Sequence, residues 1–304
     1  MHKQKNLIEK IFKLKQQRRA IILAHNYQRP EIQAIADFAG DSLELSRLAA
    51  ETKADCIVFC GVRFMAETAK ILSPQKTVLL PEYDARCPMA SLVNAEDVRA
   101  LRKQHPKAKV ICYVNTTAEV KAESDVCCTS ANAVQIIKKI DAEEIIFVPD
   151  RNLAAYCQTF TDKKIIIWDK GYCYVHDRIT MEDVNKGRNK WPEALLLVHP
   201  ECRLEVIRLA DQVLSTTGMI DYVKKSKAKK FLVATEDGIL YRMKKENPDK
   251  EFMVVGSVNQ CCNMKKTTLQ DIFYALHKNQ TKIVLKDDVI QAASYCLKAM
   301  LTYV

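Results

Sequence analysis

The chain repeats one pattern three times, with a period of 86–88 residues, and this repeat constrains its fold more than any other feature. The clearest markers are Cys87, Cys173 and Cys261, which lie 86 and 88 positions apart. Each of these cysteines follows a short apolar run, and the three consecutive isoleucines at 165–167 are typical of a buried strand. The repeat therefore predicts that each cysteine lies just beyond the end of a strand.

Two further sets of polar residues keep the same period. His25, Tyr113 and His199 each follow an apolar run, with separations of 88 and 86 positions. A hydroxyl residue follows 17 positions later in every copy, in a sequence typical of the start of a helix, namely Ser42, Ser130 and Thr216. Because three independent markers agree, the sequence predicts three copies of one α/β unit.

Apolar runs and helical patterns alternate within each unit, as strand, polar loop, helix, strand, helix, strand and cysteine loop. In the first unit we expect strands at 21–24, 56–59 and 77–80, and helices at 30–38, 42–52 and 64–72. This predicts an α/β fold of three α/β/α domains related by a pseudo-threefold axis, each with a small parallel sheet, around a central active site. The expected domains are 1–88, 89–175 and 176–266, with 267–304 packing back onto the first.

Composition and charge exclude several classes of protein. The 304 residues are 48% hydrophobic and 28% charged, as in an ordinary globular protein. No apolar run approaches the ~18 residues of a membrane span, and the first residues lead into an amphipathic helix and not a signal peptide, so we expect a cytoplasmic protein without membrane contact. The net charge of +10 comes from scattered lysines without a nucleic-acid-binding motif, and indicates a solvated surface that attracts anionic substrates.

The twelve cysteines of this chain are expected to be reduced thiols, some of them metal ligands. Five fall in apolar runs or helical segments and are expected to be buried core residues, namely Cys56, Cys60, Cys112, Cys157 and Cys296. The pattern leaves the place of Cys127, Cys128 and Cys202 open. It makes Cys262 a bystander next to Cys261, which alone of the two keeps the repeat position.

Three cysteines in threefold-equivalent positions suit a [4Fe–4S] cluster, because three thiolates can bind three irons and leave the fourth iron open. An iron without a protein ligand is a Lewis acid that can face a substrate. Two alternatives remain open, which are a zinc ion held by three cysteines and three buried cysteines that were duplicated with the fold. The spacing lacks the Cys-x3-Cys-x2-Cys pattern typical of S-adenosylmethionine radical enzymes.

The polar sets predict an anion pocket at the same edge of the sheets, where parallel strands end. Hydroxyls beside helix N-termini, next to unpaired backbone N–H groups, are suited to bind carboxylates or phosphate. The alternative for each hydroxyl alone is a structural N-cap. Glu201 is the only carboxylate of this inner set, and burial is expected to raise its pKa and to suit it as a general base.

At these residues the chain resembles the quinolinate synthase family, iron–sulfur enzymes of de novo NAD (pyridine nucleotide) biosynthesis. The similarity lies in motifs spread over nearly the whole chain, at 25–28, 40–43, 112–116, 129–133, 171–176, 199–202, 215–219 and 261–265. The resemblance implies a transferase that condenses iminoaspartate with dihydroxyacetone phosphate and releases phosphate and two waters to give quinolinate. It also implies a functional link to an enzyme that produces iminoaspartate.

The resemblance further implies a role for each residue of the repeated sets. Cys87, Cys173 and Cys261 would ligate the [4Fe–4S] cluster, whose open iron would assist dehydration. The catalytic residues would be Tyr27, His176, His199 and Glu201. The residues that bind substrate carboxylates and phosphate would be His25, Ser42, Tyr113, Asn115, Ser130, His199, Glu201 and Thr216.

Two other functions stay open at this point. A hydro-lyase of the aconitase type would use the same kind of cluster on a hydroxy acid, and release of phosphate from dihydroxyacetone phosphate would distinguish the synthase from it. A nucleic-acid-binding protein would instead show steeply salt-dependent binding that survives chelation of iron.

Overall fold

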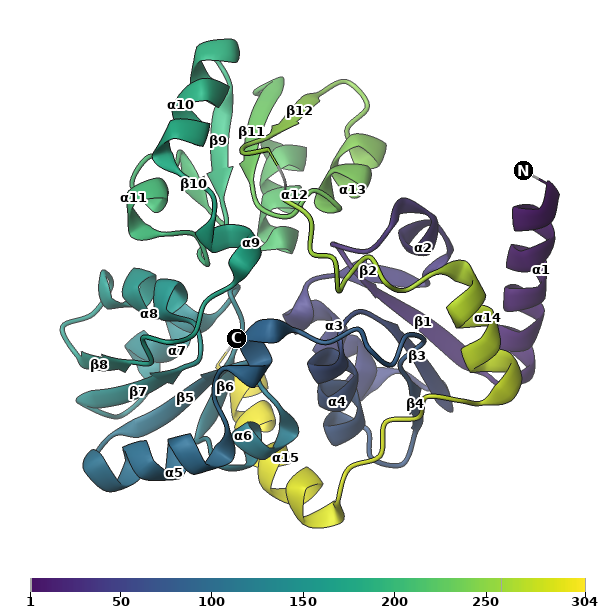
Figure 1. Ribbon diagram of the computed structural model, residues 1–304, viewed down its shortest axis with the longest axis horizontal. Coiled ribbons are helices and arrows are strands. Elements are labelled where there is room, and N and C mark those ends of the chain that lie inside the picture. Colours follow the sequence, from purple (N-terminus) through teal and green to yellow (C-terminus); the bar gives the residue numbers. More distant parts are fainter. Residues whose placement is uncertain (1, 258, 304) are drawn as a thin grey trace.

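Three small parallel sheets form the framework of the protein, as seen in a computed structural model that describes residues 2–257 and 259–303. Figure 1 shows the three units arranged around a common centre, the first in purple, the second in teal and the third in green. Every sheet has four strands, and the strand order is second, first, third, fourth in each unit. The fold predicted from the repeat is therefore confirmed.

The strands are short and their central members are buried on both faces. The first sheet contains β1 (Ala20–His25), β2 (Phe38–Gly40), β3 (Cys56–Cys60) and β4 (Thr77–Leu79). The second contains β5 (Lys109–Tyr113), β6 (Val126–Cys128), β7 (Glu144–Val148) and β8 (Lys164–Ile167). The third contains β9 (Leu195–Val198), β10 (Gln212–Val213), β11 (Lys230–Ala234) and β12 (Glu251–Val254). All five residues of β3 are buried, which explains its continuous apolar sequence.

Helices connect successive strands and cover the faces of the sheets. Those of the first unit are α1 (His2–Gln17), α2 (Pro30–Ile35), α3 (Ser42–Glu51) and α4 (Arg63–Leu72), followed by the 3-10 turn η1 (Pro88–Ser91). Those of the second are α5 (Ala95–Gln104), α6 (Ala118–Ala122), α7 (Ala133–Lys139) and α8 (Arg151–Gln158). Those that follow are α9 (Tyr174–Asp177), α10 (Met181–Lys190), α11 (Leu204–Ile207), α12 (Thr216–Lys225) and α13 (Ile239–Glu246). None of the helices in the described ranges has the length and apolar character needed to cross a membrane.

One strand of each unit was not expected from the sequence. These are the edge strands β2, β6 and β10, which have only two or three residues. In the first unit the predicted helix 30–38 ends at Ile35, and Phe38 then pairs with Leu23 of β1. Such short edge strands contain too few residues to show an alternating pattern, so their signal in the sequence is weak.

The C-terminal segment contacts two of the units. Helix α14 (Leu269–Lys278) lies against α1, and residues 281–283 extend the first sheet, because the N–H of Leu80 donates to the carbonyl of Thr281. Helix α15 (Asp287–Thr302) packs against α4 of the first unit and against α6 and β6 of the second. The expectation that 267–304 packs back onto the first unit thus leaves out the contacts of α15 with the second, which the yellow helix in Figure 1 makes visible.

Candidate functional site

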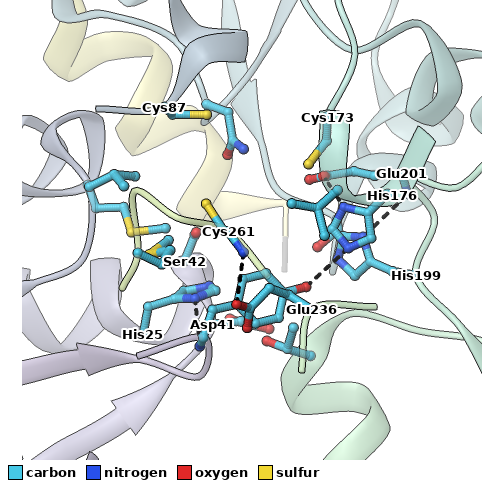
Figure 2. Close-up of a pocket in the computed structure, with 18 of the residues that line it drawn as sticks. His25, Asp41, Ser42, Cys87, Cys173, His176, His199, Glu201, Glu236 and Cys261 are labelled. Carbon is cyan, nitrogen blue, oxygen red and sulfur yellow. Dashed lines mark hydrogen bonds and ion pairs between the residues drawn. The ribbon is translucent and has the colours of Figure 1, made fainter. Parts of the chain in front are cut away.

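A single cavity at the centre of the molecule collects the residues of all three repeated sets. It encloses about 610 Å³ of empty space, part of which is open to solvent. Figure 2 shows several of these side chains pointing into the cavity from loops of different units. Every residue to which the sequence assigned a site role lines it, namely His25, Tyr27, Ser42, Cys87, Tyr113, Asn115, Ser130, Cys173, His176, His199, Glu201, Thr216 and Cys261.

The same backbone device positions each of the three cysteines. Each follows the fourth strand of its unit. The residue two positions before it accepts a hydrogen bond from a backbone N–H group three residues after the end of the third strand. The three bonds run from Arg63 N–H to Ala85 O (2.8 Å), from Arg151 N–H to Gly171 O (2.9 Å), and from Asp237 N–H to Asn259 O (3.0 Å). The repeat thus fixes three sulfur-bearing loops at equivalent places around one axis.

Each cysteine sulfur also faces two backbone N–H groups, from the second and third residues after it. For Cys87 the donors are Met89 and Ala90, and the other two loops repeat this arrangement. Such donors favour a thiolate. Burial nevertheless has the larger effect, because it raises the pKa of Cys87 to about 12 and also raises the pKa of Cys173 and of Cys261. The sulfurs therefore need a bound cation to become thiolates at neutral pH.

The spacing of the side chains limits which metal the cavity suits. In the described part of the chain, the only three potential ligand atoms that lie within 4.8 Å of one another belong to Cys173, His176 and Glu201. The three cysteine sulfurs do not form such a group. A tetrahedral zinc ion with Zn–S bonds of about 2.3 Å would hold its sulfurs roughly 3.8 Å apart. The three sulfurs are therefore not gathered in this structure as they would be around one zinc ion.

The two strand-end histidines are fixed as neutral donors. The backbone N–H of Tyr27 donates to Nδ1 of His25 (3.2 Å), and that of Glu201 donates to Nδ1 of His199 (3.3 Å). Because Nδ1 accepts, the hydrogen of each ring resides on Nε2. Burial lowers the pKa of both imidazoles to about 3, with further lowering by Lys265 at His25 and by His176 at His199. Both rings are thus uncharged hydrogen-bond donors at neutral pH.

Glu201 lies in a tight hydrogen-bonded group on the other side of the cavity. Its Oε1 accepts a hydrogen bond from the hydroxyl of Tyr113, and its Oε2 lies 2.8 Å from Nδ1 of His176. Burial acts to raise the pKa of Glu201, but His176, His199 and the Tyr113 hydroxyl together hold that pKa below its usual range. The expectation of a raised pKa is therefore wrong, because these partners outweigh burial and keep the group a carboxylate.

The hydroxyl residues of the third set do not cap their helices. Ser42 and Thr216 are the first residues of α3 and α12, whose caps are Asp41 and Ser215. Ser130 lies in the turn before α7, two residues ahead of its cap. The structural alternative for these three residues, that of N-caps, is therefore wrong. Asp41 and Ser215 accept hydrogen bonds from the first turns of α3 and α12, and all three hydroxyl residues line the cavity.

Several lining residues were missed because they do not follow the repeat; the polar or sulfur-containing ones are Asp41, Glu236, Met65 and Met264. Glu236 is fully buried and accepts hydrogen bonds from the N–H groups of Cys261 (3.0 Å) and Gly238 (2.7 Å). Its Oε1 lies 2.9 Å from Nζ of Lys265. Its position two residues after a buried strand was a signal, but the other units carry different residues there, Val62 and Asp150.

The remaining cysteines lie as the sequence suggested. The five assigned to the core are buried. Cys127, Cys128 and Cys202, which the pattern left open, are buried as well. Cys262 is exposed and does not line the cavity, whereas Cys261 does. The structure thus separates the two neighbouring cysteines in the way the repeat predicted.

Comparison with known proteins agrees with this geometry. The family described as Quinolinate synthetase A protein matches residues 9–302. The chain belongs to this family. The quinolinate synthase of Methanoregula boonei is 53% identical over 295 residues, which cover 97% of each chain. That of Thermodesulfovibrio yellowstonii is 53% identical over 297 residues and that of Methanosarcina barkeri 51% over 298 residues, with 98% of each chain covered in both cases. The resemblance seen in the motifs is therefore confirmed, and the chain is a member of a family of enzymes.

Proposed function

We propose that the protein is a quinolinate synthase that condenses iminoaspartate with dihydroxyacetone phosphate to quinolinate, phosphate and two waters. The observation that carries this proposal is the convergence of three equivalent cysteines and a ring of polar residues on one cavity, in a chain of this family. The reaction would serve NAD biosynthesis, and iminoaspartate would come from a separate enzyme. With twelve free cysteines, the protein suits a reducing compartment, and we place it in the cytoplasm.

The cofactor would be a [4Fe–4S] cluster held by Cys87, Cys173 and Cys261. Three sulfurs from three equivalent loops, each facing two backbone N–H groups, fit this group, and their spacing disfavours a single zinc ion. When bound, such a cluster supplies a Lewis acid through its open iron. The group formed by Cys173, His176 and Glu201 is a poorer metal site, since His176 and Glu201 already bind each other.

The polar ring would bind two anionic substrates without carrying much charge of its own. The neutral imidazoles of His25 and His199 donate hydrogen bonds, which suits carboxylates or phosphate. The first-turn hydroxyls of Ser42 and Thr216 add donors next to the N-termini of α3 and α12. The same role falls to Tyr113, Asn115 and Ser130 from the second unit.

Two groups would handle the protons of the condensation. Glu201 is the ionised carboxylate of the cavity, and it would take a proton from the substrate as general base. Burial raises the pKa of Tyr27 well above its ordinary value, so this phenol keeps its proton and would serve as the general acid. His176 and His199 would keep Glu201 in place and in its ionised form.

The decisive experiment is purification without oxygen, followed by analysis of iron and acid-labile sulfide and an assay for quinolinate and phosphate. We expect about four irons and four sulfides per chain, and phosphate released in step with quinolinate. Cys87→Ala, Cys173→Ala and Cys261→Ala should each lose the cluster. Zinc without sulfide, or conversion of dihydroxyacetone phosphate without phosphate release, would contradict the proposal.

A matched control comes from the neighbouring cysteine. Cys262→Ala changes the same side chain one position away, but Cys262 is exposed and lies outside the cavity. We expect this variant to keep its iron, its sulfide and its activity. Loss of iron in Cys262→Ala together with full iron in Cys261→Ala would show that Cys262 is the ligand, and would contradict the assignment of Cys261 from the repeat.

A further inference from the structure

Asn26 is a buried residue of the first unit whose side chain contacts the third unit. It directly follows β1, is fully buried, and is not among the residues that line the cavity. Its Nδ2 donates a hydrogen bond to Oγ1 of Thr216 (2.9 Å), and its Oδ1 accepts one from Nη1 of Arg242 in α13 (3.2 Å). Figure 1 shows α13 beside β2, and the same Nη1 also donates to the carbonyl of Ala39 in that strand (2.7 Å). The amide of Asn26 therefore lies between two side chains of the third unit.

Arg242 fixes which way the amide of Asn26 points. A guanidinium group can only donate hydrogen bonds, so the atom of Asn26 that faces it must be the oxygen Oδ1. The nitrogen Nδ2 then faces Thr216, and because Nδ2 can only donate, Oγ1 of Thr216 must accept. The hydroxyl hydrogen of Thr216 therefore points away from Asn26.

The two hydroxyls on either side of Thr216 use their hydrogens within the protein. Oγ of Ser215 donates to Oδ2 of Asp41 (3.0 Å). Oγ1 of Thr217 donates to Oε2 of Glu44 (2.8 Å). The hydroxyl hydrogen of Thr216, in contrast, has no acceptor among the described residues, and Thr216 lines the cavity. Of these three consecutive hydroxyls, the middle one is thus left free to donate to a bound anion.

The repeat shows that the fold does not need an amide at this position. The residues equivalent to Asn26, at intervals of 88 and 86 positions, are Val114 and Pro200, whose side chains have no hydrogen-bonding group. The strands that precede these residues, β5 and β9, form in the same way as β1. The amide that orients a first-turn hydroxyl is therefore specific to the contact between the first and third units.

We propose that Asn26 and Arg242 are positioning residues that hold the Thr216 hydroxyl as a hydrogen-bond donor to one anionic group of the substrates. This rests on the proposed function, in which Thr216 binds a substrate carboxylate or phosphate. Such anions only accept hydrogen bonds, so a hydroxyl binds them well when its hydrogen points toward them and poorly when its lone pairs do. A donor at Asn26 keeps the hydrogen of Thr216 for the substrate, and an acceptor in the same place would take it away.

The test uses Asn26→Asp, which replaces the donor that faces Thr216 by an acceptor at nearly constant shape and still offers an acceptor to Arg242. Thr216 should then donate to the new carboxylate and turn its lone pairs to the cavity. We expect the KM of one substrate to rise by about tenfold to a hundredfold, as for a lost hydrogen bond to a charged group, while kcat and the KM of the other substrate change by less than about threefold. Iron, sulfide and the thermal midpoint should match wild type.

Two uncharged variants separate orientation from the added negative charge. Asn26→Leu removes both hydrogen bonds of the side chain, and Arg242→Met allows the amide of Asn26 to turn over. Each should raise the same KM by about threefold to tenfold, the range for a neutral hydrogen bond. Asn94→Asp is the matched control for the change to a carboxylate, because the side chain of Asn94 only accepts at the N-terminus of α5, where aspartate caps equally well. This variant should keep the wild-type kcat and both wild-type KM values.

A double-mutant cycle shows whether Asn26 acts through Thr216. Thr216→Val removes the hydroxyl, so the double variant Asn26→Leu/Thr216→Val should have the same KM as Thr216→Val alone. If the two changes multiply instead, Asn26 affects the site independently of Thr216, and the proposal is rejected. Should Asn26→Asp lose its iron or its thermal midpoint, this cycle decides the question.

The remaining outcomes have distinct meanings. Wild-type KM values for both substrates in Asn26→Asp, or a lowered kcat with both KM values unchanged, would reject the positioning role and leave the proposed function intact. If wild-type protein with a full complement of iron and sulfide forms no quinolinate, the proposed function itself fails, and the role of Asn26 fails with it.

Discussion

Replacing Gly171 by alanine should displace one of the three cysteine loops. A Cβ at this position would lie 1.9 Å from the carbonyl oxygen of Pro149. Distances below 3.0 Å are essentially never seen for real Cβ atoms, so the two segments must move apart by about 1.1 Å. The neighbouring atom is backbone and cannot swing aside as a side chain would. Cys173 lies only two residues further along the chain.

The expected cost follows from this displacement. Overpacking of a well-packed site usually lowers the free energy of unfolding by about 1–3 kcal/mol. The hydrogen bond from Arg151 N–H to Gly171 O (2.9 Å), which holds the loop, would stretch at the same time. We therefore expect Gly171→Ala to remain folded but to retain less than half of the wild-type iron and sulfide after reconstitution, measured together with urea unfolding.

Gly218 provides the matched control for this change. It lies in the first turn of α12, and an added Cβ would meet its nearest neighbours at 3.4 Å, an ordinary contact distance. Because alanine is the better helix former, Gly218→Ala should raise the free energy of unfolding by up to about 1 kcal/mol and leave iron unchanged. Full iron and wild-type stability in Gly171→Ala would refute the idea that this close approach positions Cys173.

Two further predictions concern the charges of the site. The pKa of His25 and of His199 is lowered to about 3 in the folded protein, so as the pH falls below 6.5 these two histidines bind protons in the unfolded chain before they do so in the folded protein. The free energy of unfolding should therefore drop by up to about 2.7 kcal/mol per pH unit. Urea midpoints that stay constant between pH 7.5 and pH 5 would contradict this prediction. Lys265→Met leaves the buried carboxylate of Glu236 without its partner and should lower the free energy of unfolding by about 3–5 kcal/mol. The double variant Lys265→Met/Glu236→Gln should recover part of this loss. Equal stability of Lys265→Met and wild type in urea unfolding would show that the ion pair does not stabilise the fold.

The strands that the sequence predicted are those that consist of a continuous apolar run. The central strands are continuous apolar runs, and β11 was expected at 230–234 as it is found. The edge strands β2, β6 and β10 were missed, because two or three residues are held by the neighbouring strand and not by a pattern of their own.

The sequence predicted only those residues of the site whose positions follow the repeat. Residues that recur at the period, such as Cys87 and His199, could be placed at a common centre from spacing alone. Asp41 and Glu236 could not, since a search for shared positions passes over side chains that occur in one unit only. The lowered pKa of Glu201 also escaped prediction, because it depends on hydrogen bonds from Tyr113 and His176, which come from distant parts of the chain.

The covalent joining of the three units has a consequence for how such a site can arise. In a trimer of three identical subunits around the same axis, every side chain of the site would be present three times. Tyr27, Asn115 and Glu201 occupy equivalent positions, and three glutamates there would face one another across the cavity, repel, and resist ionisation. A single chain lets one copy carry the carboxylate while the others supply a phenol and an amide. Joining the three units in one chain thus allows an asymmetric site within a symmetric fold, because a residue of one unit can change without the same change in the other two.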